Sequence, residues 1–376
     1  MTARLRTASL PENKNSTEDC DMIKEQADWP RRLARWYEEN GKAYPWRQDC
    51  SPYTVWISEI MLQQTRIEAV LGYYSRFMEA FPTVQALAEA PEETVLKLWE
   101  GLGYYSRARN LHKAAQLICR DYGSEFPCRY EEIRKLPGIG DYTAGAIAAI
   151  AFGQPCTAID GNVMRVTARL CALEEDILLP ATRKRVKALL EKVYPKDSAS
   201  DFVQGLMELG EQVCIPGTPR CGNCPVKESC RARALGRTEE LPLRKKKEKQ
   251  RVQPRLVALI RRDGQVLLHR RGKKGVLAGL WEYPGVDGTD PGQMEELFRA
   301  QLGLQLIAGE HLLDTEHVFT HIRWQMSVYE ARLREKPPAE DFCWATEEQL
   351  EKEIMLPTAF RRINAGMKIF NEGEQS

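Results

Sequence analysis

Apolar residues follow two different patterns along this chain. From residue 23 to about residue 237 they recur every three or four positions, and Pro, Gly and Asn-Gly breaks separate the segments. This spacing places apolar side chains on one face of a helix. Residues 322–333 instead alternate between apolar and polar, as in a half-buried strand. The chain is therefore predicted to have an all-α part followed by an α+β part.

The first part predicts a series of helices, each bounded by turn-forming residues. They cover residues 29–40, 55–65, 68–80, 94–101, 108–122, 141–151, 182–193 and 201–213. In the second part, residues 255–262 and 265–271 flank Asp263-Gly264, which favours a two-residue hairpin turn.

The length of 376 residues fits two domains. Residues 1–20 are polar and lack periodicity, so they are predicted to be a disordered extension. An all-α domain is predicted at residues 21–236 and an α+β domain at residues 255–370. Between them, residues 237–254 include the run RKKKEK and few apolar residues, which is typical of a basic linker.

Charge and hydropathy limit the location and partners of the chain. The net formal charge is only +1, so any affinity for nucleic acid must come from local clusters of Lys and Arg. None of the apolar runs approaches the ~18 residues of a membrane span, and the N-terminus lacks the apolar core of a signal peptide. We expect a cytoplasmic protein.

Four of the 11 cysteines lie close together, with the spacing Cys214-x6-Cys221-x2-Cys224-x5-Cys230. In a long chain without a signal peptide, this clustering favours metal ligation and a reducing compartment over disulfides. Thiolates bind both zinc and iron–sulfur clusters, but zinc sites usually contain two close ligand pairs and this loop has a single CxxC. The nearby Arg and Lys residues could face phosphates or be ordinary solvated surface.

Two carboxylates are candidates for chemistry. On a helix, Glu59 would have Val55, Trp56 and Leu62 as neighbours, and partial burial among them would help it to act as an acid. Asp160 precedes a predicted helix start, where it could cap the helix, act on a substrate, or do both.

The sequence Leu136-Pro137-Gly138-Ile139-Gly140 precedes a helix rich in Ala and Gly. Two glycines around one apolar residue form a tight turn whose N–H groups can hold a phosphate. An ordinary interhelical turn would have the same sequence pattern.

Several of these motifs resemble those of one family. PWR at 45–47, SEIMLQQT at 58–65, GLGYY at 101–105, LPGIGDYTAGAI at 136–147 and the cysteine loop are similar to those of helix-hairpin-helix DNA glycosylases, and most closely to the MutY family of adenine DNA glycosylases. The resemblance covers residues 29–230. It implies a fold of two domains, an all-α helix-hairpin-helix glycosylase domain with a [4Fe–4S] loop and an α+β Nudix-like domain.

The Nudix-like resemblance of residues 255–370 rests on LWEYPG at 280–285 and HVFTH at 317–321. The metal-binding glutamates of Nudix hydrolases are replaced by Leu297, Ala300 and Gln301, which leaves Mg²⁺ without carboxylate ligands there. The resemblance therefore implies a domain that recognises 8-oxoguanine and does not hydrolyse nucleotides.

The same resemblance implies the function and the site residues. The reaction would be base excision repair by hydrolysis of the N-glycosidic bond of adenine opposite 8-oxoguanine or G, in double-stranded DNA and by a monomer. Glu59 would be the catalytic acid, and Asp160, Tyr142 and Asn162 would act at the sugar. Substrate and DNA would contact a larger set, namely Arg47, Gln64, Thr65, Leu102, Tyr104, Gly138, Gly140, Gln204, Phe319, Thr320 and His321. The cysteines Cys214, Cys221, Cys224 and Cys230 would hold a [4Fe–4S] cluster.

Without the family match, simpler interpretations fit several of these residues. Arg47 and His321 could be surface residues, Gln64 a polar helix end, and Tyr104 and Phe319 core aromatics.

Two other functions also stay open: a pyrimidine-specific glycosylase/lyase of the same superfamily, and a catalytically silent iron–sulfur DNA-binding module. Lyase relatives carry a Lys nucleophile after the hairpin, where this chain has Tyr142. A silent module would need neither carboxylate.

Overall fold

The computed structural model describes residues 28–245, 250–338 and 341–366. The predicted extension at residues 1–20 and residues 246–249 of the predicted linker lie outside the described residues. By their contacts, the residues group into two compact units. The first unit combines Met1–Ile60 with Phe126–Lys246, and the second unit combines Met61–Glu125 with Lys247–Ser376. The predicted domain boundaries remain predictions.

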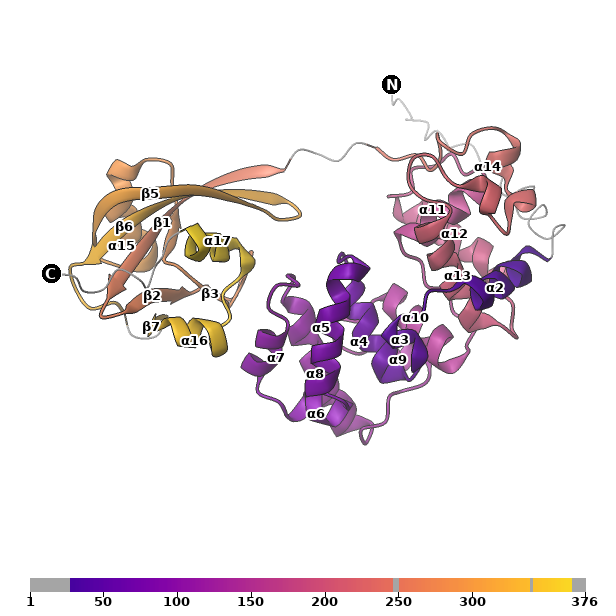
Figure 1. The fold of residues 1–376 in the computed structure, drawn as a ribbon, viewed down its shortest axis with the longest axis horizontal. Coiled ribbons are helices and arrows are strands. Elements are labelled where there is room, and N and C mark those ends of the chain that lie inside the picture. Colours follow the sequence, from indigo (N-terminus) through magenta and orange to yellow (C-terminus); the bar gives the residue numbers. More distant parts are fainter. Residues whose placement is uncertain (1–27, 246–249, 339–340, 367–376) are drawn as a thin grey trace, which may run out of the picture. The chain divides into compact units, whose positions relative to one another are not determined.

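Helices form the first unit (Figure 1). They are α2 (Trp29–Asn40), α3 (Pro45–Gln48), α9 (Tyr130–Ile133), α10 (Asp141–Phe152), α11 (Gly161–Leu170), α12 (Pro180–Val193), α13 (Ala199–Gln212) and α14 (Arg231–Ala234), with 3₁₀ turns η1 (Cys221–Asn223) and η2 (Lys227–Ser229). Helix α4 (Pro52–Leu62) runs from the first unit into the second.

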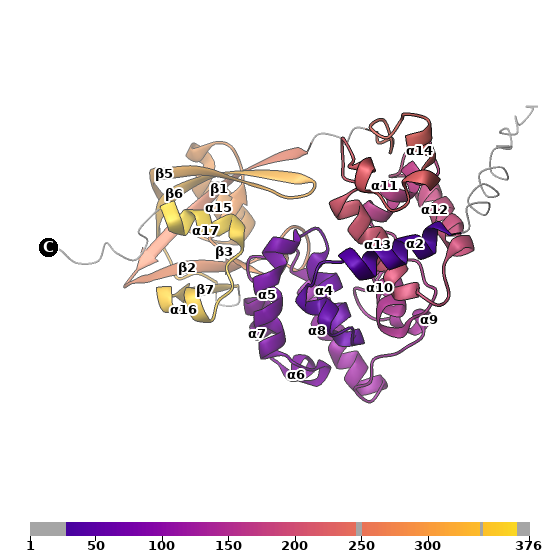
Figure 2. The same ribbon diagram turned by 45° about the vertical axis from the view of Figure 1, so that its right-hand side comes forward.

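Helix α13 lies at the centre of the first unit. It packs against α2, α10 and α11, and the views in Figures 1 and 2 agree on its place beside α2. The core there includes the fully buried Leu33, Val163 and Phe202. Glycine makes one of these approaches possible, because a Cβ on Gly210 of α13 would lie 2.6 Å from the Cβ of Asn162 on α11. Two site elements are thus held side by side.

The second unit contains the remaining helices and all the strands of the described residues. The helices from the first half of the chain are α5 (Ile67–Ala80), α6 (Val84–Glu89), α7 (Glu92–Leu98) and α8 (Ser106–Asp121). The strands are β1 (Arg251–Arg262), β2 (Gln265–Arg270), β3 (Trp281–Glu282), β4 (Gly285–Asp287), β5 (Leu306–Val318), β6 (Ile322–Leu333) and β7 (Phe342–Ala345). Helices α15 (Met294–Leu302), α16 (Glu347–Lys352) and α17 (Thr358–Gly366) and the turn η3 (Pro291–Gln293) accompany the sheet.

The strands form one mixed sheet of order β3-β2-β1-β6-β5, with β4 pairing with β1 and β7 with β2. Strands β1 and β6 are parallel, while β5 and β6 form a long antiparallel hairpin. Alternate residues of β1 face opposite sides of this sheet. Val257 and Leu259 pack towards Phe360 of α17, whereas Leu256 and Ile260 pack towards α15 (Figure 1).

Most of the predicted elements are confirmed with shifts of a few residues at their ends. The hairpin at Asp263-Gly264 forms as expected, because both residues have positive φ angles, 52° and 69°. Strand β1 begins at Arg251, four residues before the predicted start at residue 255. The extra residues are partly exposed but pair with β6, so this end of the strand needs no apolar side chains.

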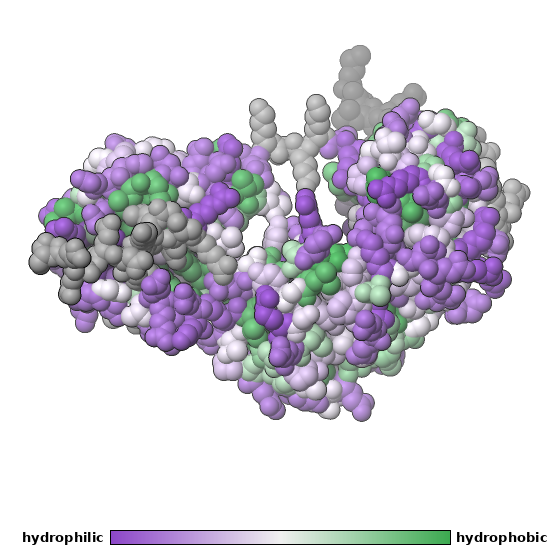
Figure 3. Space-filling model, in the orientation of Figure 1, coloured by the Kyte–Doolittle hydropathy of each residue, from purple (hydrophilic) through white to green (hydrophobic). Residues whose placement is uncertain are grey.

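On the face of the molecule in Figure 3, the described residues are mostly hydrophilic and the hydrophobic ones form small separate groups. In the described parts of the chain, none of the helices has the length and apolar character needed to cross a membrane.

Candidate active site

The predicted hairpin turn and the carboxylate at position 160 have well-defined local geometry. Gly138 has φ 76°, a conformation that suits glycine, and Gly140 directly precedes α10. Asp160 is the N-cap of α11, and its Oδ1 accepts a hydrogen bond of 2.7 Å from the backbone N–H of Val163. Burial raises the pKa of Asp160, while the N–H groups at the helix start oppose that rise. Capping and a functional role are therefore compatible.

Glu59 lies on α4 and is only 7% exposed. Its neighbours Val55 and Trp56 are buried, so the apolar setting predicted from the sequence is confirmed. Burial, followed by the nearby charge of Asp160, raises the pKa of Glu59 to about 7 despite a hydrogen bond that lowers it. A carboxyl group with this pKa can hold a proton near neutral pH and release it.

Tyr142, on the first turn of α10, supplies that hydrogen bond. Its hydroxyl donates to Oε2 of Glu59 over 2.6 Å, although the two residues are 83 positions apart in sequence. Burial and the charges of Glu59 and Asp160 raise the pKa of Tyr142 well above its ordinary value, so the phenol stays neutral. Glu59, Tyr142 and Asp160 thus form one electrostatically coupled group in the first unit.

Arg47 and Gln204 are joined through Tyr37. The guanidinium of Arg47 lies over the Tyr37 ring at 5.3 Å, and the Tyr37 hydroxyl donates to Oε1 of Gln204 over 2.8 Å. Arg47 also pairs with Glu208 over 2.7 Å, and the Glu208 side chain is fully buried. A fixed guanidinium and a side-chain amide are suited to binding the polar edge of a base.

Asn162 connects the group of Glu59, Tyr142 and Asp160 with the cysteine loop through Arg165. Arg165 Nη2 donates to Asn162 Oδ1 over 2.8 Å and to the Gly210 carbonyl over 2.6 Å. Its Nε donates to the Cys214 carbonyl over 2.7 Å. The side-chain amide of Asn162 is therefore held by the same residue that binds the start of the cysteine loop.

The four predicted ligands, Cys214, Cys221, Cys224 and Cys230, line one small cavity together with Arg169, Lys227 and Arg233. Arg169 donates to the Cys214 sulfur over 3.4 Å and to carbonyls of the loop. Among the described residues, no group of three or more His, Cys, Asp or Glu side chains has the arrangement expected around a single metal ion. In a four-iron cluster each thiolate binds a different iron, so its ligands stand further apart, and four thiols around one cationic cavity fit such a cluster.

The other predicted DNA-contacting residues of the helical part lie in two loops of the second unit. Gln64 and Tyr104 are exposed and have positive φ angles of 57° and 49°. Thr65 is partly buried, and Leu102 is 7% exposed. Positive φ in residues other than glycine is uncommon and costs free energy, and such residues cluster at functional sites.

The loop Phe319-Thr320-His321 joins β5 to β6, and it lies beside the loop that contains Tyr104. The hydroxyl oxygens of Tyr104 and Thr320 are 2.6 Å apart and share a hydrogen bond. A cavity of about 540 Å³ is lined by residues 101–106, 109, 275–278, 280, 317–322 and 357–359. The structure therefore brings these predicted recognition residues together, with Thr320 and His321 exposed.

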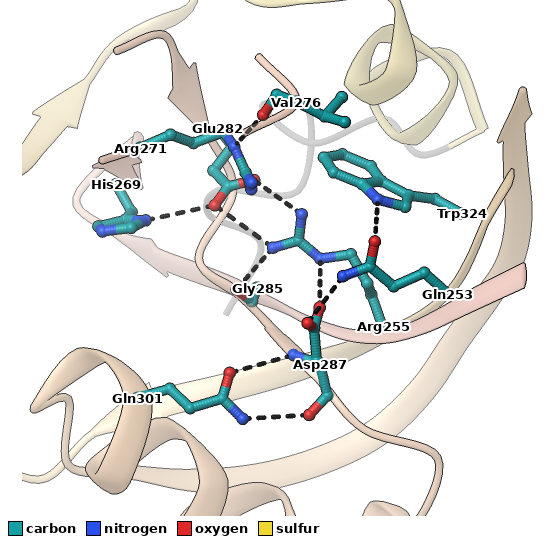
Figure 4. A network of polar contacts seen from close by, with 10 residues as sticks. All are labelled: Gln253, Arg255, His269, Arg271, Val276, Glu282, Gly285, Asp287, Gln301 and Trp324. Carbon is teal, nitrogen blue, oxygen red and sulfur yellow. Dashed lines mark hydrogen bonds and ion pairs between the residues drawn. The ribbon is translucent and has the colours of Figure 1, made fainter. Parts of the chain in front are cut away.

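A buried network of charges surrounds Glu282 (Figure 4). Glu282 accepts hydrogen bonds from Arg271 over 2.6 Å and from Arg255 over 3.4 Å. The guanidinium groups of both arginines lie over the Trp324 ring, at 5.0 and 4.3 Å, and Trp324 packs against Phe319. Burial alone would raise the pKa of Glu282, but the His269 hydrogen bond and the two guanidinium charges lower it. The two arginines hold Trp324 in place, and Trp324 in turn supports Phe319 of the loop.

Gln301, at a position where Nudix hydrolases have a metal-binding glutamate, has a structural contact. Its amide accepts from the Asp287 N–H over 3.2 Å and donates to the Asp287 carbonyl over 3.1 Å (Figure 4). Both polar ends of this side chain are directed at the backbone of β4.

The sequence analysis did not single out Glu208, Arg165 or Arg107. Spacing could have indicated the first two, because Glu208 lies four residues after Gln204 and Arg165 three residues after Asn162 on the same helix. Arg107 binds both loops of the second unit, which sequence spacing does not reveal.

Comparisons with known proteins agree with this arrangement. A model of the HhH-GPD superfamily of base excision DNA repair proteins matches residues 57–196, and a NUDIX domain model matches residues 256–365. A solved thermostable thymine-DNA glycosylase is 25% identical with a TM-score of 0.51, and the match covers 57% of this chain and 99% of that one. The predicted fold class is confirmed.

Curated relatives are similar over most of the chain. The adenine DNA glycosylase of Rattus norvegicus is 33% identical, in a match that covers 89% of this chain and 76% of the relative. That of Homo sapiens is 32% identical, and the match covers 88% of this chain and 72% of the relative. Similarity of this extent, across both the helical and the sheet-containing parts, shows that the chain belongs to the adenine DNA glycosylase (MutY) family.

Proposed function

We propose that this chain is a monofunctional adenine DNA glycosylase, which hydrolyses the N-glycosidic bond of adenine opposite 8-oxoguanine or G in double-stranded DNA. The observation that carries the proposal is the hydrogen-bonded pair of Glu59 and Tyr142 beside the capping carboxylate of Asp160. Base departure requires a proton on the purine and stabilisation of a cationic sugar. Glu59 supplies the proton, and the carboxylate of Asp160 stabilises the cationic sugar.

Each residue of the group has a separate task in this reaction. Glu59, with its pKa of about 7, protonates the departing adenine. Asp160, kept in place by the start of α11, stabilises the positive charge that develops on the deoxyribose. Tyr142 orients Glu59 through its hydroxyl, and Asn162 positions the attacking water or the intermediate. Arg47 and Gln204 bind the edge of the flipped adenine.

The remaining predicted residues bind and open the duplex. Backbone N–H groups at Gly138 and Gly140 hold a phosphate of the strand that carries adenine. Flipping the adenine leaves a gap in the base stack, which Gln64 fills while Tyr104 enters beside the opposite base. Thr65 and Leu102 support these contacts. Phe319, Thr320 and His321 read the 8-oxoguanine.

The four cysteines of the loop would hold a [4Fe–4S] cluster, which supplies a structural cross-link between the ends of the loop. The loop would then present Arg220, Lys227, Arg231 and Arg233 to the phosphate backbone. Arg169 would neutralise part of the negative charge of the cluster through its contact with the Cys214 sulfur.

The other two functions fit the site less well. Schiff-base chemistry needs an amine, and α10 carries Tyr142 and no lysine, which speaks against a glycosylase/lyase. A silent DNA-binding module would have no use for a buried Glu59 whose pKa is about 7. We propose that the protein acts on duplex DNA as a monomer in the bacterial cytoplasm, at the nucleoid.

The proposal is tested with duplexes that place A opposite 8-oxoguanine, G or T, followed by alkaline cleavage of the products. Excision should be fastest opposite 8-oxoguanine, slower opposite G and negligible opposite T. If the protein cleaves duplexes with a damaged pyrimidine and none of the three adenine duplexes, the result would support the glycosylase/lyase alternative. Mismatch binding without excision would support the silent module.

The rate of excision should depend on pH in a specific direction. Glu59 must be protonated to act as an acid, so the single-turnover rate should fall as pH rises above about 7, the pKa of that group. At low pH the rate should fall again, because Asp160 must be ionised and its pKa is raised by burial. A rate that keeps rising above pH 8 would contradict the assignment of Glu59 as the acid.

Thr320→Ala should reduce the preference for 8-oxoguanine over G. The change removes one hydroxyl, and a net hydrogen bond is worth about 0.5–1.5 kcal/mol, so the ratio of the two rates should fall roughly two- to twelvefold. Thr315→Ala, on β5 and outside the loop, is the matched control. An unchanged ratio in Thr320→Ala would remove Thr320 from lesion recognition.

A further inference from the structure

Arg107 lies near the start of α8, and it is 9% exposed. It faces two loops that are about 40 residues apart in sequence. The first loop, residues 61–65 counted with the last two residues of α4, contains Gln64. The second loop, residues 101–104, contains Tyr104.

The guanidinium of Arg107 donates hydrogen bonds to both loops. Its Nη1 donates to the carbonyls of Met61 and Gln63 over 3.0 and 2.7 Å. Its Nη2 donates to the carbonyls of Leu102 and Gly103 over 3.1 and 3.2 Å, and to Thr65 Oγ1 over 3.4 Å. One side chain thus joins the backbones of both loops.

The residues that these contacts flank have unusual backbone conformations. Gln64 and Tyr104 both have positive φ, and Arg107 binds the carbonyl directly before each of them. Residues other than glycine keep such conformations when surrounding contacts hold them there. The guanidinium supplies those contacts in both loops.

Aromatic contacts fix Arg107 itself. Its guanidinium lies 5.3 Å from the ring centre of Trp99 and 5.4 Å from that of Tyr104. Trp99 is fully buried, and its indole N–H donates to the Gly103 carbonyl over 3.1 Å. Burial lowers the pKa of Arg107 only to about 10, so the side chain stays charged at neutral pH.

We infer that Arg107 is a positioning residue for strand opening. It holds Gln64 and Tyr104 in the conformations in which the two side chains enter the base stack together. This inference rests on the proposed function, and it adds a residue that touches neither base nor sugar. Its effect is confined to substrates whose bases are stacked.

The substitution Arg107→Lys tests this role, because lysine keeps the charge but cannot bind two loops with one planar group. With A opposite 8-oxoguanine in a duplex, single-turnover excision should fall at least about tenfold, since the fork geometry is lost. With the same A opposite 8-oxoguanine inside an unpaired bubble, where the flanking stack is already open, the rate should stay within about twofold of wild type on that substrate.

The matched control is Ile118→Val, a small core deletion in the same helix that touches neither loop. It should lower the melting temperature and leave both rates as in the wild type. If Arg107→Lys does not fold, Trp99→Phe replaces it. This variant removes the indole N–H bond to Gly103 and should show the same selective loss on duplex DNA, to a smaller extent.

A fluorescent 2-aminopurine beside the mismatch reports opening of the stack without requiring excision. Its signal should rise on binding of the wild type and rise less, or more slowly, with Arg107→Lys. Equal signals, wild-type excision from duplex, or equal losses on duplex and bubble would each overturn the inference. A wild-type protein that opens the stack but releases no adenine would instead refute the proposed function.

Discussion

Glu59→Gln should lower adenine excision by about 10²–10⁴-fold, the range that a lost general acid produces. The amide keeps the size of the side chain and can still accept the Tyr142 hydroxyl, whose present bond to Glu59 is 2.6 Å long. It cannot donate a proton to the departing base. Mismatch binding should therefore stay close to that of the wild type, because the loss is confined to the transition state.

Asp160→Asn should cause a loss of similar size for a different reason. The amide retains the cap of α11, where Asp160 now accepts from Val163, but it no longer carries the charge that opposes the sugar cation. Glu131→Gln, at an exposed position in the first unit, is the control and should excise normally. Near-normal single-turnover excision by either active-site variant would refute the assignment.

Cys221→Ser should remove iron and DNA affinity together. The serine is a poor ligand for iron, and the loop between Cys214 and Cys230 would lose the cross-link that orders its basic residues. Wild-type protein should be yellow-brown, and Cys128→Ser, at an exposed cysteine outside the loop, should keep the colour. The measurements are metal analysis and binding to an A:8-oxoguanine duplex. Stoichiometric zinc without iron in anaerobically prepared wild type would contradict the cluster.

The sequence predicted individual site residues better than their connections. Asp160 before a helix start and Glu59 among apolar neighbours are local features, so spacing alone indicated a cap and a buried acid. The hydrogen bond between Tyr142 and Glu59 depends on packing between α4 and α10, and neither spacing nor the family motifs indicated it. The ion pair of Arg47 with Glu208 joins residues 161 positions apart, which no periodicity encodes.

In the sheet, too, local signals were predictable from the sequence and contacts between distant residues were not. Its two-residue hairpin followed from Asp263-Gly264, a local signal. The parallel pairing of β1 with β6 depends on residues about 70 positions apart, and it extends β1 into residues 251–254, which had the composition of a linker. The grouping of residues 61–125 with the sheet in one unit also arises from distant contacts, such as that between Tyr104 and Thr320.

If this chain releases adenine by hydrolysis, the products themselves show it. A duplex with A opposite 8-oxoguanine is incubated with the protein, and free base and DNA strands are separated and quantified, with and without borohydride. We expect one free adenine per abasic site and strands that break only after alkali. Little borohydride-trapped adduct should form, because Tyr142 stands where a lyase needs lysine. No free adenine, or an efficient trapped adduct with strand cleavage, would contradict hydrolytic release.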